Sequence, residues 1–248
     1  MKTVSLILTT YNSEENLERT LKSIENQDYP AIEVAIKDGG STDRTLNIIK
    51  EYKNKSKYQV KWSTGRDNGI YDAMNQGYQM ASGDVIVFFN DLFQKKSAVS
   101  QMVQLMEAHP ECVGAHADLV YATDEKVVRY WKMGPQKSLY LGWMPGHPTL
   151  FLKREIYEKY GLYNPNYKIA ADYEFMIRFL KDKNNQLAYL PQTIIRMYYG
   201  GTSTSGTGSY LLSLKEGHRA LRENGIKGAF IIDFFRTCRV LLQFLKHA

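Results

Sequence analysis

The sequence of 248 residues is poor in cysteine and lacks long apolar runs. Its two cysteines, Cys112 and Cys238, lie far apart without metal-ligand spacing, which argues against a disulfide scaffold and for a reducing compartment. The first apolar run, Val4 to Leu8, is interrupted by Ser5 and is too short for a signal peptide. Because no stretch of about 18 uncharged apolar residues occurs, we expect a cytoplasmic protein without a transmembrane helix.

Long runs of one charge are also lacking, although the net charge is +6. A positive excess favours anionic partners such as nucleotides or phospholipid surfaces. Because the basic residues are dispersed, we expect no nucleic-acid-binding arm and no nucleic-acid partner. The sequence contains neither a P-loop nor the glycine fingerprint of dinucleotide-binding proteins.

Apolar runs alternate with helical stripes of apolar residues through the first hundred residues. This β-α-β order predicts an α/β fold with a mostly parallel sheet and helices on both faces. The spacing of Asn12 and Glu15 predicts a capping box before the first helix. The expected strands are 4–8, 32–36, 60–62, 85–89, 149–152, 187–190 and 194–198, with further short strands within 112–132. The expected helices are 17–24, 43–52, 71–80, 98–108, 154–160, 172–180, 210–224 and 230–245, with a loop over 200–209.

Polar, glycine-rich clusters follow the first four expected strands. They are 9–12, 38–43, 65–69 and Asn90-Asp91. Each cluster alone is typical of a turn. Ligands of parallel α/β sheets bind beyond the carboxyl ends of the strands, so the four clusters together predict a nucleotide site. Asp38 or Asp67 is suited to accept the imide N–H of uracil, and Asp91 is suited to a ribose hydroxyl or a divalent cation.

Asp172 and His147 each allow two interpretations. Asp172 lies where the expected helix 172–180 begins, so it is either an N-cap or a general base that the helix N-terminus keeps ionised. His147 stands between a glycine and a proline, and either hydrogen-bonds within a structural loop or contacts phosphate, acceptor or metal.

Taken together, the motifs resemble family 2 glycosyltransferases of the GT-A fold, especially small bacterial enzymes of surface-polysaccharide assembly. The resemblance spans about residues 3 to 205 and depends on the order and spacing of its motifs. These are TTYN (9–12), KDGGSTD (37–43), DNGIYDAMNQG (67–77), ASGD (81–84), GHP (146–148), ADYE (171–174) and GGTS (200–203).

The resemblance implies an inverting transfer of a sugar from a nucleotide sugar, usually a UDP-sugar, to a glycan or lipid-linked acceptor. Asp172 matches the catalytic base of the family. The implied domain comprises residues 1–209, with a nucleotide-binding half (1–110) and an acceptor-binding half (111–209), followed by a helical appendage (210–248). The implied nucleotide contacts are Thr9, Tyr11, Asn12, Asp38, Arg66, Asp67, Asn90 and Asp91. The implied acceptor or phosphate contacts are Trp143, His147, Tyr173, Arg196 and Ser203.

The sequence departs from the family pattern directly after the strand 85–89. Family members usually carry two adjacent acids there, and an ungapped alignment places Leu92 and Phe93 at those positions. The site for a Mn²⁺ or Mg²⁺ cofactor is therefore either reduced to the single carboxylate of Asp91 or rearranged. This feature leaves an alternative open, in which the protein is a non-catalytic nucleotide-sugar binder or partner subunit.

The segment 230–245 is strongly apolar and carries Arg236 and Arg239, with Lys246 just beyond it. One interpretation is a helix that packs on the domain or on another subunit. The other is a helix that lies in a membrane interface, which would place the protein at the inner face of the cell membrane.

Overall fold

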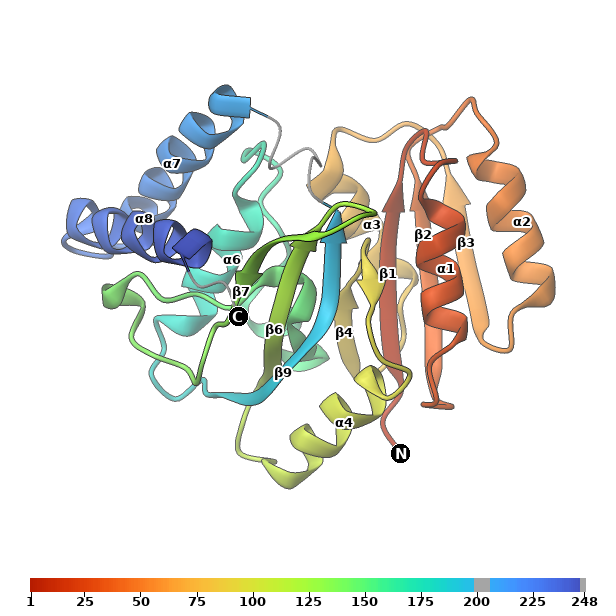
Figure 1. Cartoon of the computed structure of the whole chain (residues 1–248), viewed down its shortest axis with the longest axis horizontal. Helices are drawn as coiled ribbons and strands as arrows, with labels where there is room; N and C mark the ends of the chain where they lie inside the picture. The colour runs from red at the N-terminus through yellow and green to blue at the C-terminus, as the bar shows by residue number, and fades with distance from the viewer. Residues whose placement is uncertain (199–205, 246–248) are drawn as a thin grey trace.

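The computed structural model describes residues 1–198 and 206–245, and this part of the chain builds one nine-stranded sheet (Figure 1). The strand order is β3-β2-β1-β4-β8-β6-β9-β5, and β7 pairs with β6 at the side. Strands β1 to β4 run parallel, as do β6 and β9, whereas β8, β5 and β7 are antiparallel to their neighbours. The strands are β1 (Val4–Thr10), β2 (Ile32–Asp38), β3 (Gln59–Thr64), β4 (Val85–Phe88), β5 (Leu92–Phe93), β6 (Gly114–Ala122), β7 (Val127–Trp131), β8 (Phe151–Lys153) and β9 (Leu187–Tyr198).

Helices cover both faces of the sheet, and two of them extend beyond it. Helices α7 and α8 lie together at the end of the molecule opposite α2 (Figure 1). The helices are α1 (Leu17–Glu25), α2 (Thr45–Lys55), α3 (Ile70–Met80), α4 (Ala98–Ala108), α5 (Arg154–Tyr160), α6 (Ala171–Leu180), α7 (Gly206–Glu223) and α8 (Ala229–Leu245), with short 3₁₀ turns η1 (Leu139–Leu141) and η2 (His147–Thr149). No described helix has the length and apolarity needed to cross a membrane.

Two apolar cores lie on opposite faces of the sheet because neighbouring side chains of a strand alternate. In β1, Leu6 and Leu8 join the core that includes α1, α2 and α4, whereas Ile7 joins the core that includes α3, α5 and α6. All three side chains are buried, as expected for a parallel strand that is covered on both sides. The predicted α/β architecture is thereby confirmed, and the carboxyl ends of β1 to β4 meet at one edge.

Strand β9 is continuous, although the sequence predicts two strands separated near Pro191. Its pairing with β6 jumps from Leu190 opposite Ala117 to Thr193 opposite Asp118. Proline has no N–H to donate to a sheet ladder. The strand therefore bulges at this point and then resumes its pairing.

Leu92 and Phe93 form the two-residue strand β5 directly after Asp91. They pair with Arg196 and Ile195 of β9. The Phe93 ring is buried and stacks on Phe89, with 4.1 Å between ring centroids and 14° between ring planes. Phe93 thus fills the core, and the two residues together add a short strand at the edge of the sheet.

Two local expectations at helix starts are wrong. Helix α1 begins at Leu17 with Asn16 as its N-cap, so Asn12 and Glu15 do not form a capping box. Asn12 has a φ of 46°, and its Oδ1 accepts a hydrogen bond from the Thr42 N–H at 2.9 Å. Helix α7 begins at Gly206, within the segment expected to be a loop.

Candidate active site

The polar clusters after β1, β2, β3 and β4 are joined by hydrogen bonds between neighbouring loops. Asn90 bridges two clusters, because its Oδ1 accepts from the Thr9 N–H at 3.0 Å and its Nδ2 donates to Thr9 Oγ1 at 2.9 Å. The Asn12 N–H donates to Ser41 Oγ at 2.8 Å. Four segments that are distant in sequence therefore form one polar edge, as the parallel order predicts.

Asp38 is the central support of this edge and is fully buried. Its carboxylate accepts hydrogen bonds from hydroxyl groups and backbone N–H groups of all the neighbouring loops. The donors are Thr10 Oγ1, Gly40 N, Ser41 N, Ser41 Oγ and Thr64 Oγ1, at 2.5 to 3.1 Å. Burial alone would raise the pKa of Asp38, but the bonds from Ser41 and Thr64 outweigh it and lower the pKa. Asp38 is thus inaccessible to a nucleobase. The sequence instead suggests that Asp38 could accept the imide N–H of uracil.

Of the two candidate aspartates, Asp38 and Asp67, Asp67 has the accessible carboxylate. A Cβ atom built on Gly39 would lie 2.8 Å from Asp67 Oδ2 and 3.3 Å from Cδ2 of Tyr11, so the missing side chain leaves a surface between them. The Tyr11 ring is 66% exposed. A planar base fits such a place, stacked on an aromatic ring and hydrogen-bonded at its edge.

Lys37 holds Asp67 and its loop in place from below. Its buried Nζ donates to the carbonyl oxygens of Asp38 and Gly65, both at 2.6 Å, and lies 3.7 Å from Asp67 Oδ2. Lys37 lies within the KDGGSTD motif but was not among the predicted site residues. Arg66, a predicted nucleotide contact, is exposed and precedes Asp67 in the chain.

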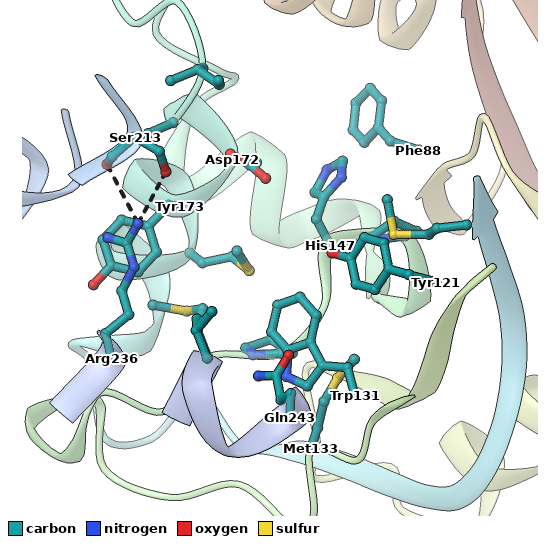
Figure 2. A pocket seen from close by; sticks show the side chains of 18 of the residues that line it. Phe88, Tyr121, Trp131, Met133, His147, Asp172, Tyr173, Ser213, Arg236 and Gln243 are labelled. Atoms are coloured by element: carbon teal, nitrogen blue, oxygen red, sulfur yellow. Dashed lines mark hydrogen bonds between the residues drawn. The ribbon is translucent and has the colours of Figure 1, made fainter. Parts of the chain in front are cut away.

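A cavity of about 570 Å³ adjoins this edge and is lined by both halves of the chain (Figure 2). Its wall joins the end of β4 to α3, α6, β7 and α8. Six of the residues predicted from the sequence line it: Asn90, Asp91, Trp143, His147, Asp172 and Tyr173.

Asp91 lies at the inner wall of this cavity and is 9% exposed. No described residue donates a hydrogen bond to its carboxylate or pairs with it, and burial raises its pKa to about 7. An orphaned buried carboxylate fits a cation or a ligand hydroxyl. The residues described do not contain a cluster of three or more metal-ligating side chains. A cation would therefore be held by Asp91 and by oxygens of the donor.

Asp172 faces the cavity from the first turn of α6 (Figure 2). The N-cap of that helix is Ala170, so Asp172 is not the cap. Asp172 Oδ1 accepts a hydrogen bond from the hydroxyl of Tyr71 on α3 at 3.0 Å. Burial, together with the charge of Asp172, raises the pKa of Tyr71, so this hydroxyl remains a donor.

Glu216 of α7, and not Asp172, binds the backbone N–H groups just before helix α6. Its buried carboxylate accepts hydrogen bonds from the N–H groups of Lys168, Ile169 and Ala170 at 2.9 to 3.1 Å. A carboxylate suits the positive end of a helix and its unpaired N–H groups. Helix α7 thus fixes the segment that carries Asp172.

His147 and Trp143 form part of the opposite wall. His147 Nε2 and the Tyr163 hydroxyl share a hydrogen bond at 2.7 Å, and the imidazole stacks on Phe88 (Figure 2). Burial lowers the pKa of His147, and the negative charge of Asp172 partly opposes this effect. Trp143 is buried and donates from Nε1 to the Met133 carbonyl at 3.0 Å.

The predicted phosphate contact Arg196 lies apart from the described site. The Arg196 guanidinium donates to the carbonyls of Thr123 and Asp124 in the β6–β7 turn, and Arg196 is not part of the cavity wall. Ser203 falls outside the described residues.

Comparison with known proteins assigns this arrangement to a family. The model of "Glycosyl transferase family 2" matches residues 5–187. The chain belongs to glycosyl transferase family 2. An uncharacterized glycosyltransferase of Mycobacterium tuberculosis (strain CDC 1551 / Oshkosh) is 32% identical over 182 residues, which cover 71% of this chain and 68% of that protein. A PGL/p-HBAD biosynthesis glycosyltransferase of Mycobacterium bovis is 25% identical over 205 residues, which cover 81% of this chain and 79% of the relative.

Solved glycosyltransferases share the fold of this family 2 member, the GT-A fold. Residues 1–349 of TarS from S. aureus were solved in complex with UDP-GlcNAc, and their structure superposes on this chain with a TM-score of 0.73 at 20% sequence identity. The match covers 98% of this chain and 71% of the TarS chain. The mannosyltransferase PcManGT from Pyrobaculum calidifontis was solved in complex with GDP-Man and Mn²⁺, and it matches with a TM-score of 0.66 at 16% sequence identity. This match covers 100% of this chain and 76% of the PcManGT chain. The expected fold and family are confirmed.

Proposed function

We propose that this glycosyltransferase moves a sugar from a UDP-sugar to an acceptor hydroxyl with inversion at the anomeric carbon, and that Asp172 is the general base. The observation that carries the proposal is the Asp172 carboxylate, which faces the cavity, does not cap its helix and is oriented by Tyr71. In this reaction the acceptor oxygen bonds to the anomeric carbon, the bond to the diphosphate breaks, and the acceptor proton passes to Asp172.

The polar edge supports the nucleotide part of the proposal. Uracil would lie on Gly39 beside Tyr11 and donate its imide N–H to Asp67, whose position Lys37 fixes. Thr9 and Asn90 would face the ribose. The UDP-GlcNAc complex of TarS makes a uridine nucleotide the first choice among donors.

A divalent cation is part of the proposal, with Asp91 as its protein ligand. Mg²⁺ and similar ions are often held by one or two carboxylates together with substrate phosphates and water. When bound, such an ion would neutralise charge on the departing diphosphate. The structure of PcManGT holds Mn²⁺ beside GDP-Man. We expect EDTA to abolish turnover by the wild type, and Mn²⁺ or Mg²⁺ to restore it but not to restore turnover by Asp91→Asn.

A lipid-linked or glycan acceptor of surface-polysaccharide assembly is proposed, with α8 in contact with the inner face of the cell membrane. Helix α8 exposes Phe230, Phe234 and Leu241 on one side, at 81%, 65% and 60% exposure. The spacing of these residues places them on one helix face. An exposed apolar face on a chain of net charge +6 is suited to an anionic lipid surface.

A donor panel tests the proposal. Thermal shift with UDP, GDP and dTDP sugars selects the donor, since a ligand stabilises the state that binds it. UDP release and the anomeric configuration of the product, read by NMR, then report transfer. We expect stabilisation by one UDP-sugar and an inverted product. Tight donor binding without turnover, with acceptors and cation supplied, would instead identify a non-catalytic nucleotide-sugar binder, the alternative that Leu92 and Phe93 suggest.

A further inference from the structure

Helix α8 supplies one wall of the cavity with two arginines. Arg236 and Arg239 are one helical turn apart and both line it. Gln243, one turn further along the helix, lines it too, and Figure 2 shows Arg236 and Gln243 on this wall. Residues three apart on a helix share a face. Helix α8 thus presents cationic groups to the cavity, beside the residue that follows the proposed base.

The guanidinium of Arg236 is oriented but not neutralised. It stacks on the Tyr173 ring with 4.3 Å between its Cζ and the ring centroid, and its Nη2 donates to the carbonyl and the hydroxyl of Ser213 at 3.4 and 3.2 Å. Its Nη1 is buried and has no hydrogen-bond partner, and no carboxylate among the described residues lies within 4.0 Å of the guanidinium. The nearby Asp233 pairs with His218 at 2.7 Å instead. Nη1 packs against Gly217 of α7, and the guanidinium as a whole lines the cavity without a carboxylate to neutralise it. A half-buried guanidinium of this kind is suited to an oxyanion.

Helix α7 leaves room for this guanidinium by carrying a glycine at position 217. A Cβ atom built there would overlap Arg236 Nη1. Glycine inside a helix makes the helix less stable than alanine would. The chain therefore accepts a weaker helix at a position where a side chain would displace the Arg236 guanidinium.

Charges on the cavity wall indicate which anion fits. The wall carries Lys132, Lys168, Arg236 and Arg239, against the carboxylates of Asp91 and Asp172. Cations exceed acids by two, which matches a phosphate dianion better than a carboxylate. Arg236 lies against Tyr173, next to Asp172, and the acceptor must approach Asp172 to lose its proton.

We propose that Arg236, with Arg239 and Lys168, forms a subsite for a phosphate-type group of the acceptor. The binding site itself is independent of catalysis. Only its assignment to the acceptor rests on the proposed function, through the place of Asp172.

Phenyl phosphate is a suitable probe, and its dissociation constant is measured by ligand-observed NMR on the full chain saturated with UDP. We expect Arg236→Gln and Gly217→Ala to weaken binding at least about 10-fold, the effect of losing one charge-assisted contact. Gly217→Ala keeps the positive charge of Arg236 but displaces its guanidinium. Two controls should bind as the wild type does: Gly208→Ala on α7, where the added Cβ meets open space, and Arg219→Gln, whose guanidinium is paired with Glu223.

Several outcomes would overturn the inference. These are equal affinity in the wild type and Arg236→Gln, loss of phenyl phosphate from the wild type when UDP is added, and tighter binding of benzoate than of phenyl phosphate. The second outcome would assign Arg236 to the donor diphosphate, and the third would replace phosphate by carboxylate. If no nucleotide sugar is turned over, the proposed function fails, and the same titration without UDP still decides whether the anion subsite exists.

Discussion

Tyr71 on α3 and Asp172 on α6 meet at the cavity although they are 101 residues apart in sequence, with the Tyr71 hydroxyl 3.0 Å from Asp172 Oδ1. The bond joins the glycine-rich motif after β3 to the helix that carries the proposed base. Tyr71 is a positioning residue in this account, because it acts on the substrate only through Asp172.

We expect Tyr71→Phe to lower kcat about 10-fold or more and to leave the donor KM unchanged. A hydrogen bond to a charged group contributes roughly 1.5 to 3 kcal/mol, and this one is needed to aim the carboxylate. Tyr29→Phe is the matched control, because it removes a tyrosine hydroxyl that donates to the Lys2 carbonyl far from the cavity. If Tyr71→Phe has the kcat of the wild type, the positioning role is wrong.

Asp38 and Asp67 should respond in opposite ways to the same substitution. Asp67→Asn should raise the Kd for UDP and leave the free energy of unfolding close to that of the wild type. Asp38→Asn should lower the free energy of unfolding by about 1 to 3 kcal/mol, since a buried acceptor of several hydrogen bonds is lost. Urea denaturation and UDP titration of both variants separate the two effects. An unstable Asp67→Asn beside a stable Asp38→Asn would contradict the assignment.

The sequence does not reveal that Asp38 is buried and Asp67 accessible. Both follow a strand in a polar, glycine-rich cluster, so the local pattern does not distinguish them. What separates them is the set of donors around Asp38, which come from its own loop and from the ends of the two neighbouring strands β1 and β3. The strands themselves were predictable, because continuous apolar runs are required where helices cover both faces.

Contacts between distant segments were the main features that the sequence did not reveal. Nothing local indicates that Glu216 caps the segment before Asp172 or that Leu92 pairs with Arg196. The first contact could be found only by knowing that α7 packs against α6. Tyr71 had a weaker signal, because it lies within a motif that the resemblance already used.

Acid stability should depend on Glu33, which is buried in β2 and accepts hydrogen bonds from Ser5, Ser82 and Lys61. Burial alone would raise its pKa, but these bonds lower it from 4.5 to about 2. A depressed pKa adds stability above the unfolded value and loses it as the pH falls through the folded value. We expect Glu33→Gln to be less stable at pH 7 and to show a flatter fall of unfolding free energy between pH 4.5 and 2. Urea denaturation across that range checks this, and parallel curves for the two proteins would refute it.

Membrane contact through α8 should depend on its exposed apolar face. We expect the wild type to float with vesicles containing phosphatidylglycerol, and the double variant Phe234→Ser, Leu241→Ser to remain below them. Vesicles of phosphatidylcholine alone test the contribution of the positive net charge. Binding to them should be weaker, because they contain no anionic lipid to attract that charge. Equal flotation of both proteins would exclude this face as the membrane contact.

In the proposed reaction Asp172 takes the proton from the acceptor, and the variant Asp172→Asn removes this step. Asparagine keeps the size of the side chain and can still pair with Tyr71, but it cannot serve as a base at neutral pH. Transfer is measured as product formed per enzyme from the donor that the panel selects, beside UDP affinity on the same sample. We expect unchanged UDP affinity with transfer lowered by about 100-fold or more, the usual range for loss of a general base. Transfer at the wild-type rate by Asp172→Asn would contradict it.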